Sequence, residues 1–254
     1  MNKLKKLETL RKKLKSMNPS IGSWMQTSDT NIAEILGSNG FDWIAIDIEH
    51  GSISLDKLPD IFRSIELNDT IPFARISHVN PDECKKVMDS GACGVIAPNI
   101  NNENELKILI DSCSWPPSGS RGVGFSRANL FGKNFEEYKS FAQKPFIVAM
   151  IESSKALDNI EKILSVNGLD AILIGPYDLS ASLGVTGKFN SEEFLNAIEI
   201  IKNSCIKFNI PYGIHIVEPN PEELKTKINE GCTFIPYSMD TRFISAYSQN
   251  PIKE

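Results

Sequence analysis

The feature that most constrains the fold is a regular alternation of short apolar stretches with longer stretches of helical periodicity. The eight apolar stretches, which we predict to be strands, are residues 21–25, 43–48, 72–76, 94–98, 146–151, 171–174, 212–217 and 234–237. The helical stretches between them are residues 30–38, 55–67, 81–90, 103–113, 157–166, 192–208 and 221–230. Continuous apolar strands separated by helices indicate a parallel sheet covered by helices. Eight such units predict a single-domain (β/α)8 TIM barrel, and a length of 254 residues is typical of that fold.

Local signals at the expected helix ends agree with this pattern. Asn80-Pro81 and Asn220-Pro221 each place a capping side chain before a proline, which is favoured in the first turn of a helix. No G-x-G-x-x-G follows the first predicted strand, so a dinucleotide-binding fold has no support. The connection at residues 114–145 is long for a compact barrel, and we expect it to be a functional loop.

The chain begins with a basic segment, which we predict to be an amphipathic helix within residues 1–19, ahead of a barrel domain at residues 20–254. Leu4, Leu7, Leu10 and Leu14 have helical spacing. The segment lacks the continuous apolar stretch of a signal peptide. We expect the helix to close one end of the barrel, and binding to a membrane surface is the alternative.

The composition favours a small-molecule partner over nucleic acid or membrane. The formal net charge is -5 and the isoelectric point is about 5.4, so no overall field attracts nucleic acid. No run of about 18 apolar residues is present, so we expect no transmembrane helix. The five cysteines are scattered and show no C-x-x-C spacing, which is typical of free thiols in a reducing compartment. We therefore expect a cytoplasmic protein.

Polar residues gather where the predicted strands end, which is where (β/α)8 enzymes carry their catalytic groups. They include Asp47, Glu49, His50, Arg75, Asn99, Glu152, Asp178, His215 and Asp240. The set is rich in carboxylates and poor in thiols and imidazoles, so an oxygen-ligated cation such as Mg²⁺ or Mn²⁺ is favoured over zinc. For any single residue of the set, a surface salt bridge is the alternative.

Covalent catalysis finds no support at the same positions. No lysine falls at a predicted strand end, where a Schiff-base aldolase would need one. No G-x-S-x-G motif is present for a serine hydrolase. The pattern therefore favours electrophilic catalysis by a metal ion.

Several motifs occur in a specific order along the chain. They are G-F-D-W at 40–43, D-I-E-H-G at 47–51, P-F-A-R at 72–75, M-D-S-G-A at 88–92, P-P-S-G-S-R-G at 116–122, I-E at 151–152 and I-G-P-Y-D-L-S at 174–180. With these motifs the chain resembles the HpcH/HpaI aldolase family over roughly residues 20–245. Members of that family are class II, metal-dependent pyruvate aldolases, such as 2,4-dihydroxyhept-2-ene-1,7-dioate aldolase, on a phosphoenolpyruvate/pyruvate-type barrel.

The resemblance implies a role for each matching residue. Glu152 and Asp178 would bind the divalent metal, which would be Mg²⁺, Mn²⁺ or Co²⁺. His50 would be the general base, made more basic by Asp89, and Arg75 would stabilise an enolate. The positions expected to contact substrate are Met150, Gly175, Pro176, Tyr177 and Asp178. Asp47 and Glu49 would hydrogen-bond water molecules that are bound to the metal.

These roles imply a reversible cleavage of a 4-hydroxy-2-oxo acid to pyruvate and an aldehyde. The metal would act as a Lewis acid on the 2-oxo acid, and Arg75 would add a permanent positive charge beside the enolate. His50 would take the proton of the 4-hydroxyl group. The partners would be a small 2-oxo acid and an aldehyde, and the family implies a homo-oligomer, such as a hexamer or a trimer of dimers.

Three positions leave the expected substrate contacts open. Met150 stands where the family commonly has glutamine, and a thioether cannot donate the same hydrogen bond. His215 matches no family position, so a structural role and a substrate contact are both open. Arg127, in the long connection, is a candidate contact to a distal acidic group of the substrate.

Two other functions also stay open at this point. Acyl-CoA lyases of the citrate-lyase β and malyl-CoA type have a similar metal site, but the extra basic surface that CoA needs is not evident. A non-catalytic barrel that binds a metal or a 2-oxo acid is the other alternative. Such a scaffold has no need of His50, Arg75, Glu152 and Asp178 together.

Overall fold

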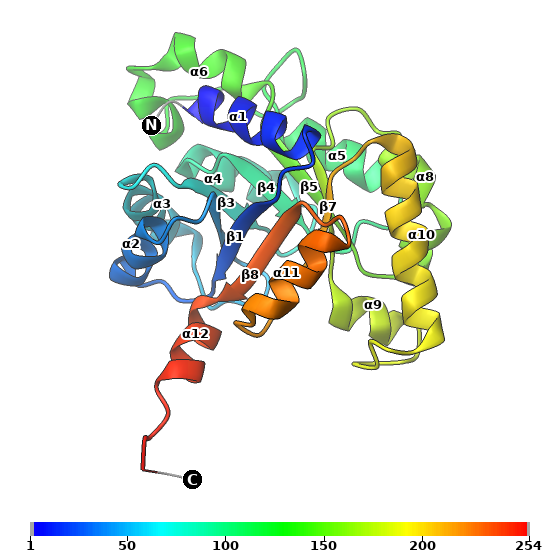
Figure 1. The fold of residues 1–254 in the computed structure, drawn as a ribbon. Coiled ribbons are helices and arrows are strands. Elements are labelled where there is room, and N and C mark those ends of the chain that lie inside the picture. Colours follow the sequence, from blue (N-terminus) through cyan, green and yellow to red (C-terminus); the bar gives the residue numbers. More distant parts are fainter. Residues whose placement is uncertain (1–2, 253–254) are drawn as a thin grey trace.

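A computed structural model describes residues 3–252 and shows a (β/α)8 barrel, as the sequence pattern predicts (Figure 1). Residues 1, 2, 253 and 254, which the expected helix and barrel ranges include, lie outside the described residues. The parallel strands are hydrogen-bonded in the order β7-β6-β5-β4-β3-β2-β1-β8. They are β1 (Ser20–Met25), β2 (Trp43–Asp47), β3 (Ile71–Arg75), β4 (Gly94–Ala97), β5 (Phe146–Ile151), β6 (Ala171–Ile174), β7 (Tyr212–Ile214) and β8 (Phe234–Met239).

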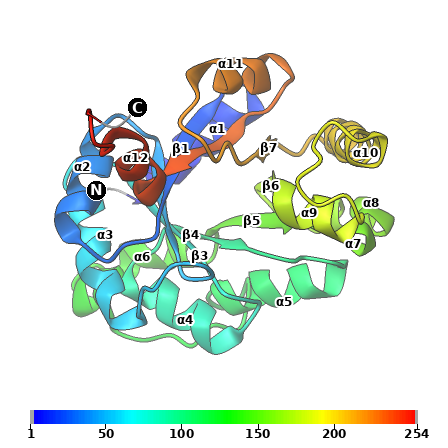
Figure 2. The ribbon, with the colours of Figure 1, turned by 90° about the horizontal axis from the view of Figure 1, so that it is seen from below.

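Helices surround these strands as a ring when the barrel is viewed from below (Figure 2). They are α1 (Lys3–Lys15), α2 (Thr30–Ser38), the short 3-10 helix η1 (Leu55–Lys57), α3 (Leu58–Glu66), α4 (Pro81–Ser90), α5 (Glu103–Cys113), the 3-10 segment η2 (Arg127–Gly132), α6 (Phe135–Ala142), α7 (Ser154–Asp158), α8 (Ile160–Leu164), α9 (Pro176–Ser182), α10 (Glu192–Phe208), α11 (Pro221–Asn229) and α12 (Asp240–Tyr247). Asn80 and Asn220 cap α4 and α11 as expected, each accepting two backbone N–H bonds. None of the helices within residues 3–252 has the length and apolar character needed to cross a membrane.

The structure corrects several expected boundaries. The long connection at 114–145 is not one loop, because it contains η2 and α6. The single helix expected at 157–166 is instead α7 and α8, which are separated at Asn159, where the backbone leaves the helical region. Helices α9 and α12 had a weak sequence signal, since α9 is only seven residues long and α12 exposes its apolar Ile244 and Tyr247.

The barrel closes between β7 and β8. The amide of Thr233 donates to the carbonyl of Tyr212 (2.8 Å), and the amide of Ser238 donates to that of Ile216 (2.7 Å). The expected strand at 212–217 is too long, because β7 ends at Ile214 and Ile216 forms only an isolated bridge. A Cβ atom at Gly213 would lie 1.7 Å from the carbonyl oxygen of Phe234, so only glycine permits this close approach.

Aromatic rings fill the interior of the barrel. The rings of Trp43 and Phe234 stack with centroids 4.4 Å apart, although β1 separates their strands. The rings of Phe73 and Phe146 stack at 5.1 Å across β4 in the same way. Contacts that skip a strand require both side chains to point inward. Since side chains alternate along a strand, residues two or four positions farther on, at the carboxyl ends, also face the interior.

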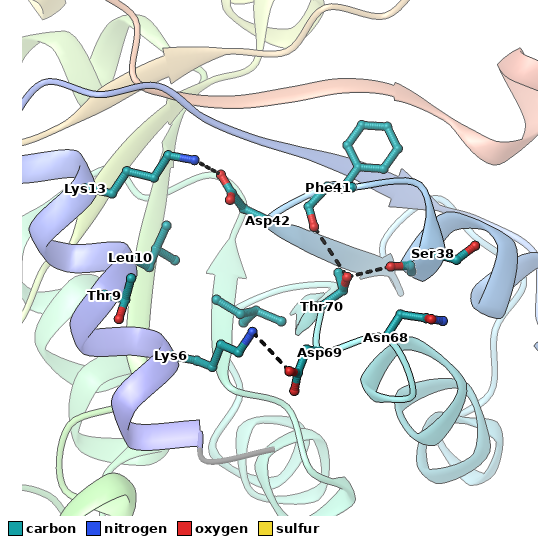
Figure 3. A pocket seen from close by; sticks show the side chains of 13 residues that line it. Lys6, Thr9, Leu10, Lys13, Ser38, Phe41, Asp42, Asn68, Asp69 and Thr70 are labelled. Atoms are coloured by element: carbon teal, nitrogen blue, oxygen red, sulfur yellow. Dashed lines mark hydrogen bonds and ion pairs between the residues drawn. The ribbon is translucent and has the colours of Figure 1, made fainter.

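Helix α1 covers the opposite end of the barrel, where the strands begin (Figure 1). Leu7, Leu10 and Leu14 are buried against the core, as expected for a helix that closes this end. The guanidinium of Arg11 donates two hydrogen bonds to Asp170 (2.6 and 2.9 Å), and Lys13 pairs with Asp42 at 2.6 Å (Figure 3). These basic residues of α1 therefore face carboxylates of the barrel itself.

A cavity of about 400 Å³ lies beside α1, next to the segments that lead into β2 and β3 (Figure 3). The ammonium of Lys6 lies 3.7 Å from Asp69 there, and the hydroxyl of Thr70 donates to the carbonyl of Gly37 (2.7 Å). The cavity lies at the end of the barrel where the strands begin. (β/α)8 enzymes act at the other end, where the strands finish, so we do not expect this cavity to be the active site.

We expect Gly213→Ala to destabilise the barrel by about 3 kcal/mol, because the new methyl group would overlap the backbone of β8. Gly124→Ala is the matched control, since no atom lies within 4 Å of the position of its Cβ. Its effect should stay within about 0.5 kcal/mol. Chemical denaturation of the two variants measures both values. Equal stability of the two variants would contradict the close packing of β7 on β8.

Candidate active site

A buried ion pair forms the floor of the carboxyl end of the barrel. Asp47 and Arg75 are register partners at the ends of β2 and β3. Arg75 Nε and Nη2 donate to the two oxygens of Asp47 at 2.8 and 2.6 Å, and the guanidinium lies 4.6 Å from the ring centre of Trp24. Burial opposes ionisation of Asp47, but the hydrogen bonds and charge of Arg75 outweigh it and lower the pKa of Asp47. The arginine is therefore held rigidly and stays charged.

Gln26, which was not among the predicted site residues, also holds this pair in place. Gln26, immediately after β1, donates from Nε2 to Asp47 at 2.9 Å. The buried carboxylate of Asp240 fixes this loop, accepting the backbone N–H groups of Gln26 and Thr27 at 2.9 Å each. The signal for Gln26 was its place at the end of a strand, which it shares with the other polar residues of the site.

Glu49 and His50 lie on the loop that follows β2. Glu49 Oε2 is 3.2 Å from Arg75 Nη1 and 3.8 Å from His50 Nε2, and it is buried without a hydrogen bond. Burial is the main reason that the pKa of Glu49 is raised, with the charges of Arg75 and His50 opposing the shift. The imidazole of His50 is more than half exposed, so it is accessible to a substrate at the mouth of the barrel.

Glu152 follows β5 and is buried. Its Oε2 accepts the backbone N–H of Asn99 at 2.8 Å. A Cβ atom at Gly175 would lie 2.2 Å from Glu152 Oε1, so the glycine leaves room for the carboxylate. Burial, together with the negative charges of Glu49 and Asp178, raises the pKa of Glu152 to about 7, against the opposing Asn99 N–H and Arg75. Asn99, expected at the end of β4, holds this carboxylate through its backbone.

The remaining expected substrate contacts lie at two places. Gly175 precedes α9, and Pro176, Tyr177 and Asp178 form its first turn, with Tyr177 and Asp178 exposed. Met150 is buried in β5, four residues beyond the inward-facing Phe146. Its side chain therefore faces the interior of the barrel.

Two residues are held away from this cluster. Asp89, on α4, accepts a hydrogen bond from Arg121 Nη1 at 2.9 Å, and within residues 3–252 no hydrogen bond or ion pair joins it to His50. Arg127 does not reach a substrate position, because it donates to Glu66 at 2.6 Å and to the carbonyl of Ser90 at 3.0 Å. The candidate contact of Arg127 with a distal substrate group is thus replaced by a structural role.

The charges at the mouth suit a divalent cation. Four carboxylates gather there with one guanidinium, and those carboxylates are Asp47, Glu49, Glu152 and Asp178. Glu152 and Asp178 offer the hard oxygen ligands that Mg²⁺ and Mn²⁺ prefer. Within residues 3–252, no group of three or more histidine, cysteine, aspartate or glutamate side chains is positioned to hold a metal ion by itself. A bound cation would therefore take its other ligands from water and substrate.

We expect Asp47→Asn to lower the free energy of unfolding at pH 7 by about 3 kcal/mol, because it removes the charged group to which the buried Arg75 donates two hydrogen bonds. The folded-state pKa of Asp47 is lower than its ordinary value of 3.8, so this stabilisation is present above about pH 4. It is lost as the pH falls through the folded-state pKa. The difference between variant and wild type should therefore shrink on acidification. Denaturation curves from pH 7 to pH 3 test this, with the exposed Asp158→Asn as control, and a difference that grows in acid would contradict it.

The comparisons with known proteins agree with this geometry. The family model for HpcH/HpaI aldolase/citrate lyase matches residues 20–246. A hydroxypyruvate/pyruvate aldolase of Roseobacter denitrificans is 34% identical over 241 residues, which cover 92% of this chain and 91% of that protein. A 5-keto-4-deoxy-D-glucarate aldolase of Escherichia coli is 29% identical over 221 residues, covering 87% and 86%.

The solved structures show the same fold. A crystal structure of an HpcH/HpaI aldolase/citrate lyase family protein from Burkholderia cenocepacia superposes with a TM-score of 0.88 at 25% identity, covering 94% of this chain and 96% of that one. The order of motifs along the sequence and the carboxylate cluster at the barrel mouth point the same way. The chain belongs to the HpcH/HpaI aldolase/citrate lyase family and is a carbon–carbon lyase of the aldolase type.

Proposed function

We propose that this enzyme reversibly cleaves a 4-hydroxy-2-oxo acid to pyruvate and an aldehyde, with a divalent cation held by Glu152 and Asp178. The observation that carries the proposal is the surplus of carboxylates around the buried guanidinium of Arg75 at the carboxyl end of the barrel. The names of the similar aldolases support a 2-oxo acid as the substrate. They also favour this reading over an acyl-CoA lyase.

The cation, when bound, would supply Lewis acidity to the 2-oxo acid. Arg75 places a fixed positive charge beside the oxygen on which negative charge develops during cleavage. Asp47 keeps that guanidinium in one orientation, so little reorganisation is needed during the reaction. Gly175, Pro176 and Tyr177, at the start of α9, would orient the substrate carboxylate, and Met150 would contact the substrate from the interior.

His50 is the proposed acid–base group. Its exposed imidazole takes the proton of the 4-hydroxyl group as the carbon–carbon bond breaks and returns it in the reverse direction. Glu49 lies beside this ring, with its Oε2 3.8 Å from His50 Nε2. Asp89, which lies on α4, is paired with Arg121. The proposed action of Asp89 on His50 therefore requires an Asp89 from a second copy of the chain. We therefore include a homo-oligomer in the proposal.

The location of the protein is a further part of the proposal. All five cysteines are free and buried. Five unpaired thiols are typical of a reducing compartment, which supports a cytoplasmic enzyme.

The first test concerns the metal. Exhaustive chelation should abolish pyruvate release from a 4-hydroxy-2-oxo acid, and Mg²⁺, Mn²⁺ or Co²⁺ should restore it. Glu152→Gln and Asp178→Asn should each weaken Mn²⁺ binding in calorimetric titration by about tenfold or more, because each removes a charged ligand. Asp158→Asn, an exposed carboxylate on α7, is the control and should bind Mn²⁺ as the wild type does. Full activity after chelation would exclude the proposed metal dependence.

The second test isolates enolate formation from cleavage. The enzyme should exchange the methyl protons of pyruvate for deuterium in D₂O, and NMR follows this without any aldehyde. Arg75→Lys should slow the exchange by about 10²–10³-fold, because lysine cannot reproduce the two-point bond to Asp47 or the position of the charge. Exchange by the variant at the wild-type rate would show that Arg75 does not stabilise the enolate.

A further inference from the structure

His215 lies inside the barrel, just beyond the end of β7. Its ring contacts the ring of Trp24 edge-to-face with centroids 5.8 Å apart, although β8 separates β7 from β1. Only an inward-pointing side chain can make such a contact. The guanidinium of Arg75 lies over the ring of Trp24. Trp24 therefore contacts both His215 and Arg75, the residue proposed to face the reacting atoms.

The imidazole is held on one side and free on the other. The backbone carbonyl of Ser238 is the acceptor that faces the ring, and it favours the protonated form. Nε2 is buried and has no hydrogen-bond partner, which leaves Nδ1 to donate to Ser238. In that tautomer the proton is on Nδ1, and Nε2 is a hydrogen-bond acceptor.

The backbone that receives this bond is itself fixed. Ser238 has a positive φ of 54°, its amide donates to Ile216, and its hydroxyl donates to Val217 at 3.0 Å. Its carbonyl also accepts the hydroxyl of Ser23 at 3.2 Å. A non-glycine residue in this conformation persists only where its surroundings enforce it. The closure of β7 on β8 therefore sets the direction of the His215 ring.

The ring is uncharged across the working pH range. Burial, reinforced by the positive charge of Arg75, lowers the pKa of His215 to about 3. His215 also borders a cleft of about 740 Å³ that is lined mainly by residues of α10 and α11, on the outer side of β7, and by the first turn of α9. Its link to the reacting centre is instead Arg75, whose charge acts on the ring inside the barrel. Met150, on β5, also faces the interior but offers only a weak thioether acceptor.

We propose that Nε2 of His215 accepts a hydrogen bond from a substrate hydroxyl group outside the reacting 4-hydroxy-2-oxo unit, and thereby selects hydroxylated substrates. The reacting 4-hydroxyl already has His50 as its base, so the group recognised by His215 is an additional one. A buried acceptor without a partner is costly, and a substrate hydroxyl satisfies it. This inference rests on the proposed aldolase reaction.

The experiment compares four pairs of substrates in the synthetic direction. The donors are pyruvate and hydroxypyruvate, and the acceptors are acetaldehyde and glycolaldehyde. His215→Phe keeps a ring against Trp24 but has no acceptor. It should lower kcat/KM by about tenfold for the pairs that carry the recognised hydroxyl, as expected for one hydrogen bond, and by less than twofold for pyruvate with acetaldehyde. His215→Gln, whose amide can place an acceptor near Nε2, should recover most of the loss.

The pattern among the pairs decides the outcome. A loss confined to hydroxypyruvate assigns the hydroxyl to the donor, and a loss confined to glycolaldehyde assigns it to the acceptor; either supports the inference. An equal loss for all four pairs indicates a structural role only, and no loss for any hydroxylated pair likewise overturns it. Deuterium exchange into pyruvate by the wild type is measured in parallel. If the wild type shows no exchange, the proposed aldolase reaction fails, whereas normal exchange with an equal loss in all pairs rejects only the role of His215.

Discussion

The structure of the active site depends on the ion pair between Asp47 and Arg75. Both side chains project into the barrel from neighbouring strands, and two hydrogen bonds, the face of Trp24 and the amide of Gln26 surround them. A buried guanidinium is tolerated because its counter-charge is equally fixed. This pair gives the mouth of the barrel one permanent positive charge. Glu49, His50 and Glu152 are arranged around that charge.

The carboxylates around that charge are the basis of the proposed cation site. Glu49 and Glu152 are both buried and both have raised pKa values, so the chain alone does not neutralise the site. Glycine at 175 and the backbone amide of Asn99 nevertheless hold the carboxylate of Glu152 in place. A fold that maintains such an unfavourable cluster is consistent with a ligand of opposite charge.

Much of this was predictable from the sequence, because inward-facing residues at strand ends follow directly from the periodicity of the strands. The barrel itself and the grouping of Asp47, Arg75 and Glu152 depend on that pattern alone. The contacts of Gln26, Asn99 and Asp240 were not predictable in the same way, since they involve backbone atoms or second contacts that only the folded loops create. The pairing of Asp89 with Arg121, and of Arg127 with Glu66, depended on the unpredicted structure of residues 114–145.

The central claim is that Glu152 and Asp178 share one divalent cation at the carboxyl end of the barrel. A crystal structure of the protein soaked with Mn²⁺ and oxalate, a mimic of the 2-oxo acid enolate, tests it most directly through the anomalous signal of manganese. We expect a single strong peak beside both carboxylates, with oxalate oriented toward Arg75. A peak at any other carboxylates, or none at all with both side chains well ordered, would contradict it.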